Sequence, residues 1–265
     1  MAGRTWQDIW RGVAEDLQLR MEGESLRGSL LGVPVECEPD VRVSGRHPEG
    51  TWFLPATGPT TRVRALPAVP PPADLLLDVR PHSGLWPTPS TTGDPGFDGA
   101  FLVHGGDQHV AAVFLSPALR ETLRLTSGWR FVMRGGHVWA YVGRLELDPL
   151  PLASAMRGVA SLAARCEELG ERLQESAELL GGTRARGPWR DDDVIELERD
   201  GVGVRVQHAC TAGSLETRAI ARRGASAPEE IVRAPGFVTQ FVQLEALVSE
   251  AVSLANPRKG ATPYR

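Results

Sequence analysis

Three histidines and one aspartate are the residues of this chain whose types and spacing could bind a metal ion. His104, Asp107 and His109 lie within the sequence HGGDQH, and His137 follows them in a predicted hairpin. Imidazole and carboxylate groups are ordinary ligands of zinc and other first-row metals. Their spacing matches no established metal motif, so surface and capping roles for these four residues stay open beside a metal site.

Other familiar catalytic signatures are missing from the sequence. It contains no GxSxG or SxxK nucleophile motif, no Walker loop, no GxGxxG fingerprint and no HExxH zinc motif. Asp191-Asp192-Asp193 lacks the pattern of a calcium loop, so we expect a solvated acidic turn there. We therefore assign no catalytic residue and no cofactor from the sequence.

The three cysteines are expected to be free, buried thiols. Cys37, Cys166 and Cys210 are odd in number and widely spaced, and no CxxC pair occurs. Cys166 also falls on the apolar stripe of a predicted helix, where it would act as a small hydrophobic side chain.

Composition points to a globular protein of the cytoplasm. The 265 residues suffice for one large domain or two small ones, and 42% of them are apolar and 23% charged. A net charge of −4 argues against nucleic-acid binding, which needs a basic surface. Apolar runs are too short for a membrane helix, and the first residues lack a signal-peptide pattern, so we expect no membrane contact.

The polar residues above are carried by the segment from Thr92 to Leu125. Asp94-Pro95 and Ser116-Pro117 are both helix-start signals, because a short polar cap is followed by proline at the first helical position. Between them, residues 100–103 are apolar and predict a short buried strand. The segment is therefore a folding signal before it is a chemical one.

Periodicity predicts the remaining elements. An amphipathic helix is expected at 5–19 and a final helix at 237–255. Arg134-Gly135-Gly136 is expected to join the two strands of a hairpin, at 129–133 and 137–142. Further strands are predicted at 29–38, 61–66, 75–79, 194–198, 202–208 and 215–220.

The longest predicted helix begins at Asp148-Pro149 and ends at Gly181-Gly182. Its apolar residues repeat in alternating steps of four and three, which is a heptad pattern. They are Leu152, Met156, Val159, Ala163, Cys166, Gly170, Leu173, Ala177 and Leu180. Packing inside the chain and pairing with a second chain both remain open, although the small seam residues favour internal packing.

These elements predict an α+β fold with mainly antiparallel sheets, covered by the long helix and the terminal helices. We expect one domain at 1–182, ending in the long helix, and a smaller lobe at 183–265 after the polar linker 183–193. GVPVEC with TTRVRALPAV is echoed by GVGVRVQHAC with ETRAIARRGA. An internally duplicated strand unit and chance similarity are both compatible with this echo.

The phrase TGDPGFDGAFLVHG followed by LSPALRETLRL resembles a recurrent segment of uncharacterised bacterial α+β proteins. The resemblance covers about Trp6 to Leu180 and implies a strand-rich first half followed by a long helix. It implies no activity, cofactor or catalytic residue.

The function that we expect from the sequence is that of a non-catalytic cytoplasmic interaction or accessory protein, with a protein partner or a second copy. The heptad seam and the tryptophans in predicted loops and hairpins, such as Trp129 and Trp139, favour this hypothesis. The cluster of Arg218, Arg222 and Arg223 could bind an anionic partner or simply aid solubility. The alternatives are a metal-dependent hydrolase and a small-ligand binding domain.

Overall fold

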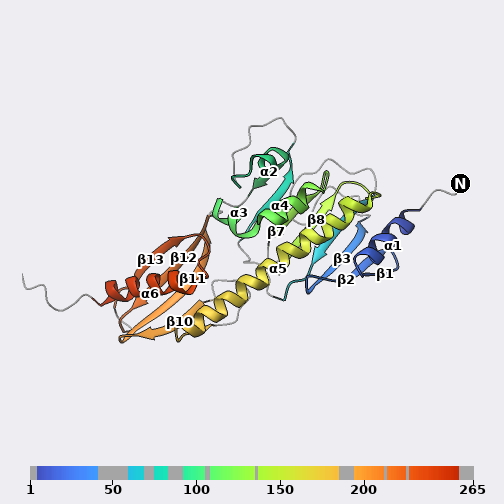
Figure 1. Cartoon of the computed structure of the whole chain (residues 1–265). Coiled ribbons are helices and arrows are strands. Elements are labelled where there is room, and N and C mark those ends of the chain that lie inside the picture. Colours follow the sequence, from blue (N-terminus) through green and yellow to red (C-terminus); the bar gives the residue numbers. More distant parts are fainter. Residues whose placement is uncertain are drawn as a thin grey trace, which may run out of the picture. The chain divides into compact units, whose positions relative to one another are not determined.

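The structure is a computed structural model that describes residues 5–40, 59–68, 75–82, 92–104, 108–134, 137–184, 194–211, 214–224 and 227–256. The chain divides into two compact units, Met1–Glu167 and Glu168–Arg265. The expected α+β class is confirmed, because antiparallel sheets are combined with a long helix and a C-terminal helix (Figure 1). In the described part of the chain, no helix is both long and apolar enough to cross a membrane.

The first unit holds the larger sheet. Across the described residues its eight strands lie in the order β1-β2-β3-β4-β8-β7-β5-β6, and every pairing is antiparallel. The strands are β1 (Arg20–Glu22), β2 (Ser25–Leu30), β3 (Val33–Asp40), β4 (Thr60–Ala65), β5 (Leu77–Pro81), β6 (Phe101–His104), β7 (Arg130–Arg134) and β8 (His137–Val142). The helices of this unit are α1 (Trp6–Asp16), α2 (Pro95–Ala100), α3 (Gln108–Phe114), α4 (Pro117–Arg124) and the first part of α5 (Pro149–Leu179). The predicted N-terminal helix, the hairpin of β7 and β8 and the long helix are therefore confirmed.

Alternation along the strands gives the larger sheet a buried apolar face. In β4, Val63 and Ala65 are buried, and they lie opposite Cys37 and Val35 of β3. Because side chains alternate along a strand, the residues between them lie on the other face, as Arg64 does opposite Glu36. The core of this unit therefore lies between the apolar face of the sheet and the helices.

The strand predicted at 29–38 is two strands joined by a tight turn. Leu31 and Gly32 separate β2 from β3 and both have positive φ, at 54° and 82°. Two positive φ values in a two-residue loop are typical of a type I′ hairpin turn. The alternation of apolar residues masked this turn, because Leu31 continues the pattern although it is 67% exposed.

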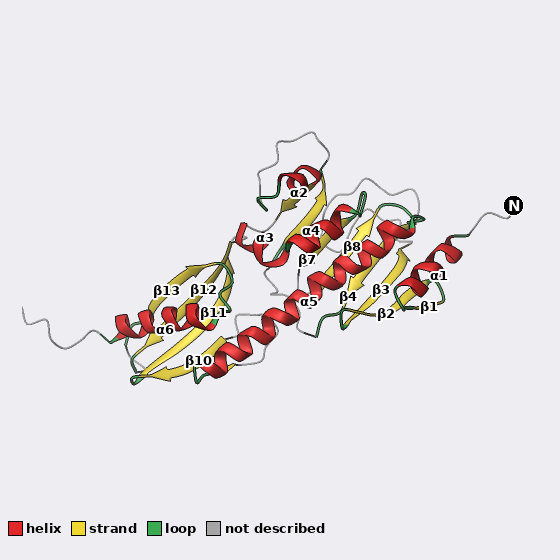
Figure 2. Cartoon of the chain, viewed as in Figure 1, coloured by secondary structure: helices red, strands yellow, loops and turns green. Residues whose placement is uncertain are grey.

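The long helix α5 packs inside the chain along its apolar seam. Its seam residues are buried, including Leu152, Val159 and Leu173. At Gly158, an added Cβ would lie 2.9 Å from Leu123 Cδ2 and 3.1 Å from Phe131 Cε1, so the helix closely approaches α4 and β7. Figure 2 shows α5 as one continuous helix. The buried seam is therefore not the surface that pairs with a second chain.

The second unit holds the smaller sheet. Among its described residues, five strands lie in the order β13-β12-β11-β10-β9, again antiparallel throughout. They are β9 (Thr183–Arg184), β10 (Val194–Arg199), β11 (Val202–Thr211), β12 (Ser214–Arg222) and β13 (Glu230–Pro235). The helix α6 (Phe241–Ala255) covers one face of β11, β12 and β13 (Figure 1).

Several sequence expectations differ from the structure. Glu230 begins β13, a strand that is absent from the strands predicted from the sequence. The division between the two units lies within α5, whereas the sequence placed a boundary between 182 and 183. The echoed strands β3–β4 and β11–β12 are both antiparallel neighbours, but β12 is followed in its sheet by β13 whereas β4 is followed by β8. A duplication therefore stays a hypothesis.

Candidate functional site

His104, the last residue of β6, lies beside an arginine of the neighbouring strand. Its Nε2 atom is within hydrogen-bonding distance of the Arg80 guanidinium on the neighbouring strand β5. Partial burial of the ring, followed by the positive charge of Arg80, lowers the pKa of His104 below its ordinary value. His104 is therefore a neutral imidazole next to a cation at neutral pH, which favours a hydrogen bond with Arg80.

His104 and His137 are too far apart to bind one metal ion. His137 begins β8, which is three strand spacings from β6 in the sheet order. At about 4.8 Å per spacing, the two strands are on the order of 14 Å apart, whereas zinc ligands lie about 2 Å from the ion. Among the described residues, no group of three His, Cys, Asp or Glu side chains could hold a metal.

The other two metal candidates lie elsewhere. Asp107 is outside the described residues, and His109 is the second residue of helix α3, with its side chain outside the description. A metal site that uses these two residues therefore stays a prediction. The acidic residues 191–193 and the proline-rich residues 69–72 are also outside the described part of the chain.

A part-buried charge network crosses three strands of the larger sheet. Arg130 on β7 donates from Nε to Asp78 Oδ1 at 2.6 Å and from Nη1 to the Tyr141 hydroxyl at 2.6 Å. Burial lowers the pKa of Arg130, but its hydrogen bonds to Asp78 outweigh that effect and raise it overall. The hydrogen bonds of Arg130 therefore join β7 to β5 through Asp78 and to β8 through Tyr141.

The described cysteines are chemically quiet. Cys37 and Cys166 are buried free thiols, as the sequence predicts. Burial raises the pKa of Cys37 well above its ordinary value and that of Cys166 to about 12. Since the thiolate is the nucleophile, neither side chain reacts readily near neutral pH. The side chain of Cys210 lies outside the described residues.

The polar residues of the Thr92–Leu125 segment join α2 to α4. Asp94 caps α2, accepting hydrogen bonds from the backbone N–H groups of Gly96 and Phe97 at 3.1 Å each. Arg124 of α4 donates to the same Asp94 carboxylate at 2.6 Å. Ser116 caps α4 in turn by accepting from the Leu119 N–H at 3.3 Å. These residues therefore have structural roles, as the helix-start signals predict.

Glu146 is a buried carboxylate that stabilises the first unit. It is 2% exposed and accepts hydrogen bonds from Trp129 Nε1 at 3.1 Å and from Arg144 Nη2 at 2.9 Å. Its backbone carbonyl accepts a further bond from Trp10 Nε1 at 2.9 Å. Trp129 is 0% exposed, so it belongs to the core and not to an interface.

The smaller sheet has a face of charged side chains, which we name the charged face. Its residues are directly opposed in the strand register, so they share one side of the sheet. It consists of Glu196, Glu198, Gly203, Arg205, Gln207, Glu216, Arg218, Ile220, Arg222, Ile231 and Arg233. Arg199 and Val204 are on the other side, where Arg199 donates to Glu245 of α6.

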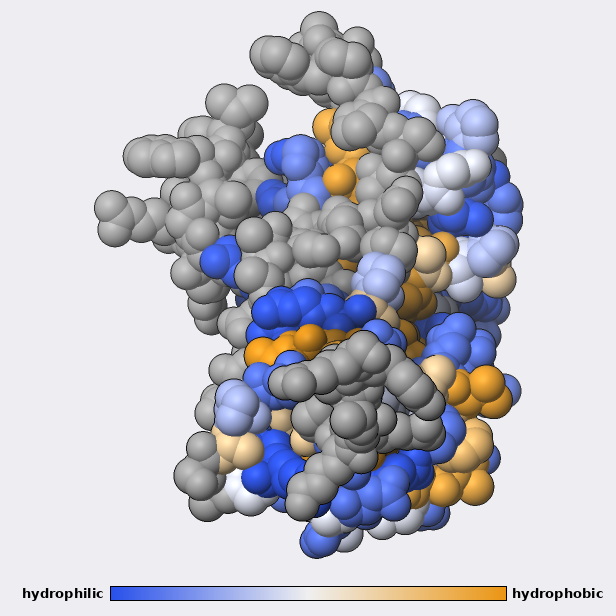
Figure 3. Space-filling model, turned by 90° about the vertical axis from the view of Figure 1, so that its left-hand side faces the viewer, coloured by the Kyte–Doolittle hydropathy of each residue, from blue (hydrophilic) through white to orange (hydrophobic). Residues whose placement is uncertain are grey.

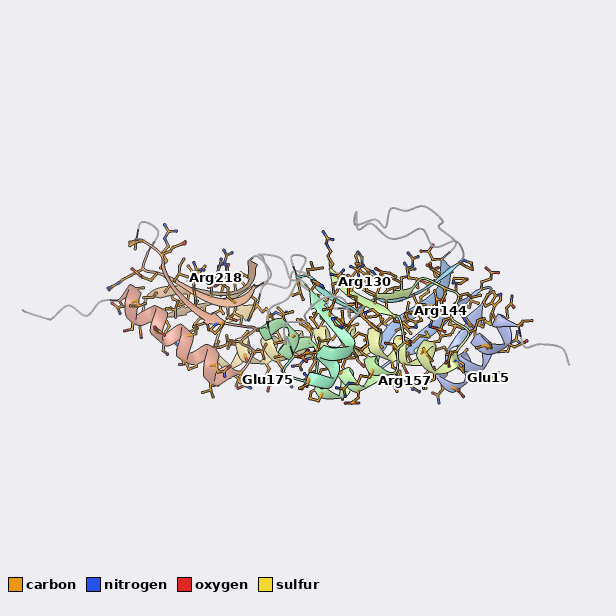
Figure 4. All side chains as sticks on the ribbon, turned by 90° about the horizontal axis from the view of Figure 1, so that it is seen from above. Glu15, Arg130, Arg144, Arg157, Glu175 and Arg218 are labelled. Carbon is orange, nitrogen blue, oxygen red and sulfur yellow. The ribbon has the colours of Figure 1, made fainter. Side chains whose placement is uncertain are left out.

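The charged face lies away from α6 and is substantially exposed. Figure 4 shows Arg218 on the side of the strands opposite to the α6 ribbon. Arg205 is 51% exposed, Glu196 is 59% exposed and Ile231 is 43% exposed. Arg218 and Arg222 from the sequence cluster both lie on this face, whereas Arg223 follows β12 and donates to Asn256 Oδ1 at 2.8 Å.

Ion pairs on the charged face are of two kinds, long exposed pairs and a closer group around Glu216. The Arg205–Glu196 pair has a separation of 3.6 Å and the Arg222–Glu229 pair one of 3.9 Å. Pairs of this kind contribute about 0–1 kcal/mol when they are exposed. Burial raises the pKa of Glu216, but hydrogen bonds from Arg218 and Arg233 outweigh it and leave that pKa below its ordinary value. The exposed Arg205–Glu196 pair can therefore be re-paired by a partner at little cost, whereas Glu216 is already paired with two arginines.

A hollow of about 750 Å³ lies over the charged face. Glycines 201, 203 and 224 leave room along its wall, and an added Cβ at Gly203 would meet only Arg222 O, at 3.7 Å. The remaining lining residues are Glu196, Leu197, Glu198, Val204, Arg205, Ile220, Arg222 and Glu229. Hydrophobic residues form small patches bordered by hydrophilic ones on the face of the molecule that Figure 3 displays.

Sequence reasoning missed the charged face as a unit, because cross-strand register brings its members together. Within one strand, residues two apart lie on the same face, so the sequence could place Glu196 with Glu198, and Gly203 with Arg205. It could not show that these two pairs share one face of the sheet. No protein-family model, curated protein or solved structure matches the chain.

Proposed function

We propose that this chain is a non-catalytic accessory protein of the bacterial cytoplasm that binds another protein chain through the charged face. The observation that carries the proposal is an exposed sheet face on which an apolar pair lies among charged side chains, at the β12–β13 edge. Ile220 and Ile231 are directly opposed there, and Ile231 is 43% exposed. Protein interfaces combine apolar contacts with polar and charged ones, and Arg205, Arg218 and Arg233 lie beside this pair in the register.

The arginines of the charged face suit a protein partner. Arg222 and Arg233 are 46% and 54% exposed in their side chains. Arginine is enriched at interface hot spots, because its planar guanidinium forms paired hydrogen bonds with carboxylates. The hollow suits a protein better than a small molecule, since small-ligand pockets are mostly apolar and this one is rich in charged side chains.

The experiment isolates the tagged chain from its native host at endogenous level and identifies what co-purifies by mass spectrometry. Ile231→Asp places a charge in the apolar pair on the edge strand β13, and Val242→Asp makes the matched change on α6, where Val242 is 76% exposed. We expect a stoichiometric protein with the wild type and with Val242→Asp, and its loss with Ile231→Asp.

Three outcomes would count against the proposal. A wild-type chain that neither retains another protein nor associates with itself would leave no role for the charged face. A stoichiometric metal lost on combined mutation of His104 and His109 would instead support the metal-dependent hydrolase. Thermal stabilisation by a metabolite would support the small-ligand domain.

A further inference from the structure

Two arginines of the larger sheet come opposite one another on the face that its apolar side chains leave. The register of β5 and β7 pairs Val79 with Phe131, and both of these side chains are buried in the core. Arg80 and Arg130 lie one residue further along each strand, so they are opposed on the other face of the sheet. Like charges that are directly opposed across a strand pair destabilise it unless a counter-charge lies beside them.

The carboxylate beside these arginines is committed to one of them. Asp78 accepts hydrogen bonds from Arg130 at both of its oxygens, from Nε at 2.6 Å and from Nη2. The side chains of Arg130 and Asp78 are only 13% and 9% exposed, so this pair is held within the sheet. Among the described residues, two guanidinium groups therefore share one carboxylate, and the charge of Arg80 is left without a counter-charge.

Arg80 also has few hydrogen-bond partners. A guanidinium group carries five N–H donors, and among the described residues only His104 Nε2 lies within hydrogen-bonding distance of Arg80. The Nε atom of Arg80 is shielded from solvent, and none of the described residues accepts a hydrogen bond from it. A shielded donor of this kind costs free energy until it finds an acceptor.

His104 holds Arg80 without compensating its charge. Partial burial lowers the pKa of His104 most, the charge of Arg80 lowers it further, and Asp78 and Arg130 have smaller, opposite effects. A neutral imidazole that accepts at Nε2 brings no negative charge to the arginines. His104 is exposed at the end of β6, so a solute can reach this pair from solvent.

We propose that Arg80, with Arg130 and His104 beside it, binds an oxyanion, namely a phosphate or carboxylate group of a small molecule. We name these three residues the arginine site. An oxyanion brings both the negative charge and the acceptor atoms that Arg80 lacks, and a planar guanidinium can pair two N–H groups with two oxygens of either group. The arginine site belongs to the first unit, so it does not depend on the function proposed for the charged face.

The test is isothermal titration calorimetry of the full chain with inorganic phosphate and, separately, with acetate. Sodium chloride keeps the ionic strength constant, so that screening does not change during the titration. Arg80→Gln removes the uncompensated charge. Arg11→Gln is the matched control, because Arg11 lies on α1, is 58% exposed in its side chain and pairs with Asp8. Circular dichroism melting checks that each variant is folded.

We expect saturable binding of one ion per chain at millimolar concentration. Arg80→Gln should weaken this binding at least about tenfold, whereas Arg11→Gln should leave it unchanged. The ion that binds more tightly shows which group the site prefers, phosphate or carboxylate.

A second measurement needs no variant of Arg80. The imidazole NMR signals of His104 in the wild type, assigned by their loss in His104→Gln, should shift along the same saturation curve. Those of His208, which belongs to the second unit, should stay in place.

Three results would overturn the inference. The first is the absence of saturable binding of either ion, and the second is an affinity that survives Arg80→Gln or falls equally in Arg11→Gln. The third is a set of His104 signals that do not shift when the ion binds, because the ion would then occupy another part of the chain.

Discussion

Glu146 shows how one buried carboxylate stabilises the first unit. It is 2% exposed and accepts hydrogen bonds from Trp129, Arg144 and the Asp148 N–H. Glu146→Ala would leave the indole N–H of fully buried Trp129 without this acceptor. We expect the free energy of unfolding to fall by about 1–3 kcal/mol, measured by urea denaturation.

The control for that prediction is a carboxylate in an exposed ion pair. Glu121 is 68% exposed in its side chain and pairs with Arg124 within α4. Glu121→Ala should change the free energy of unfolding by about 0.5 kcal/mol or less. Equal effects of the two substitutions would contradict a special role for Glu146.

The lowered pKa of Asp94 should make the stability of the fold depend on pH. The hydrogen bond from the Phe97 N–H, followed by the charge of Arg124, lowers the pKa of Asp94 below its ordinary value of 3.8. Ionised Asp94 therefore stabilises the fold fully above pH 3.8, and this contribution is lost as the pH falls through the lowered value. Asp94→Asn keeps a good N-cap and removes the charge. The variant should be less stable than the wild type at neutral pH, and the difference should vanish in acid. A difference that is constant with pH, in melting curves at several pH values, would refute the electrostatic role.

At the scale of elements, Gly158 allows α5 to pack closely against α4 and β7, because it has no side chain. An added Cβ would lie 2.9 Å from Leu123 and 3.1 Å from Phe131, both of which are fully buried. Gly158→Ala should therefore lower the free energy of unfolding by about 1–3 kcal/mol through overpacking, despite the better helix propensity of alanine.

Gly12 in α1 provides the matched comparison. An added Cβ there would meet no atom within 4 Å, so Gly12→Ala should raise the free energy of unfolding by about 0.5–1 kcal/mol. Chemical denaturation of both variants shows whether the free energy of unfolding falls for Gly158→Ala and rises for Gly12→Ala, as expected. Stabilisation by Gly158→Ala would show that α5 can move away from the sheet without loss.

The elements that sequence predicts well are those with local signals. Asp94-Pro95, Ser116-Pro117 and Asp148-Pro149 each precede an observed helix, because caps and prolines act within one turn. The turn at Leu31 was missed because a leucine rarely adopts positive φ. The strand β13 was missed because its formation depends on pairing with β12, which no local signal in the sequence predicts. The charged face needs that same register, so its composition follows from tertiary structure and not from any one segment.

At the scale of the whole molecule, α5 contributes to both units, and this determines where the chain can be divided. Within the second unit, Leu173 and Ala177 of the last part of α5, and Leu180 directly after it, are buried. Ser176 donates a hydrogen bond to the Thr239 carbonyl at 2.7 Å, just before α6. A lobe that began at residue 183 would lose all of these groups.

We therefore expect the fragment 168–265 to be more stable than the fragment 183–265. Burial of a leucine side chain contributes about 1.5–3 kcal/mol, so the loss of Leu173 and Leu180 alone removes a large share of the stability of a small unit. Thermal unfolding followed by circular dichroism should show a cooperative transition for 168–265 and a broad one, or none, for 183–265. Equal melting temperatures would mean that β9–β13 and α6 form a complete core, and that the end of α5 is an accessory to it. A higher melting temperature for 168–265 would mean that the end of α5 belongs to the core of the second unit. The sheet that carries the charged face would then depend on both α5 and α6 for its stability.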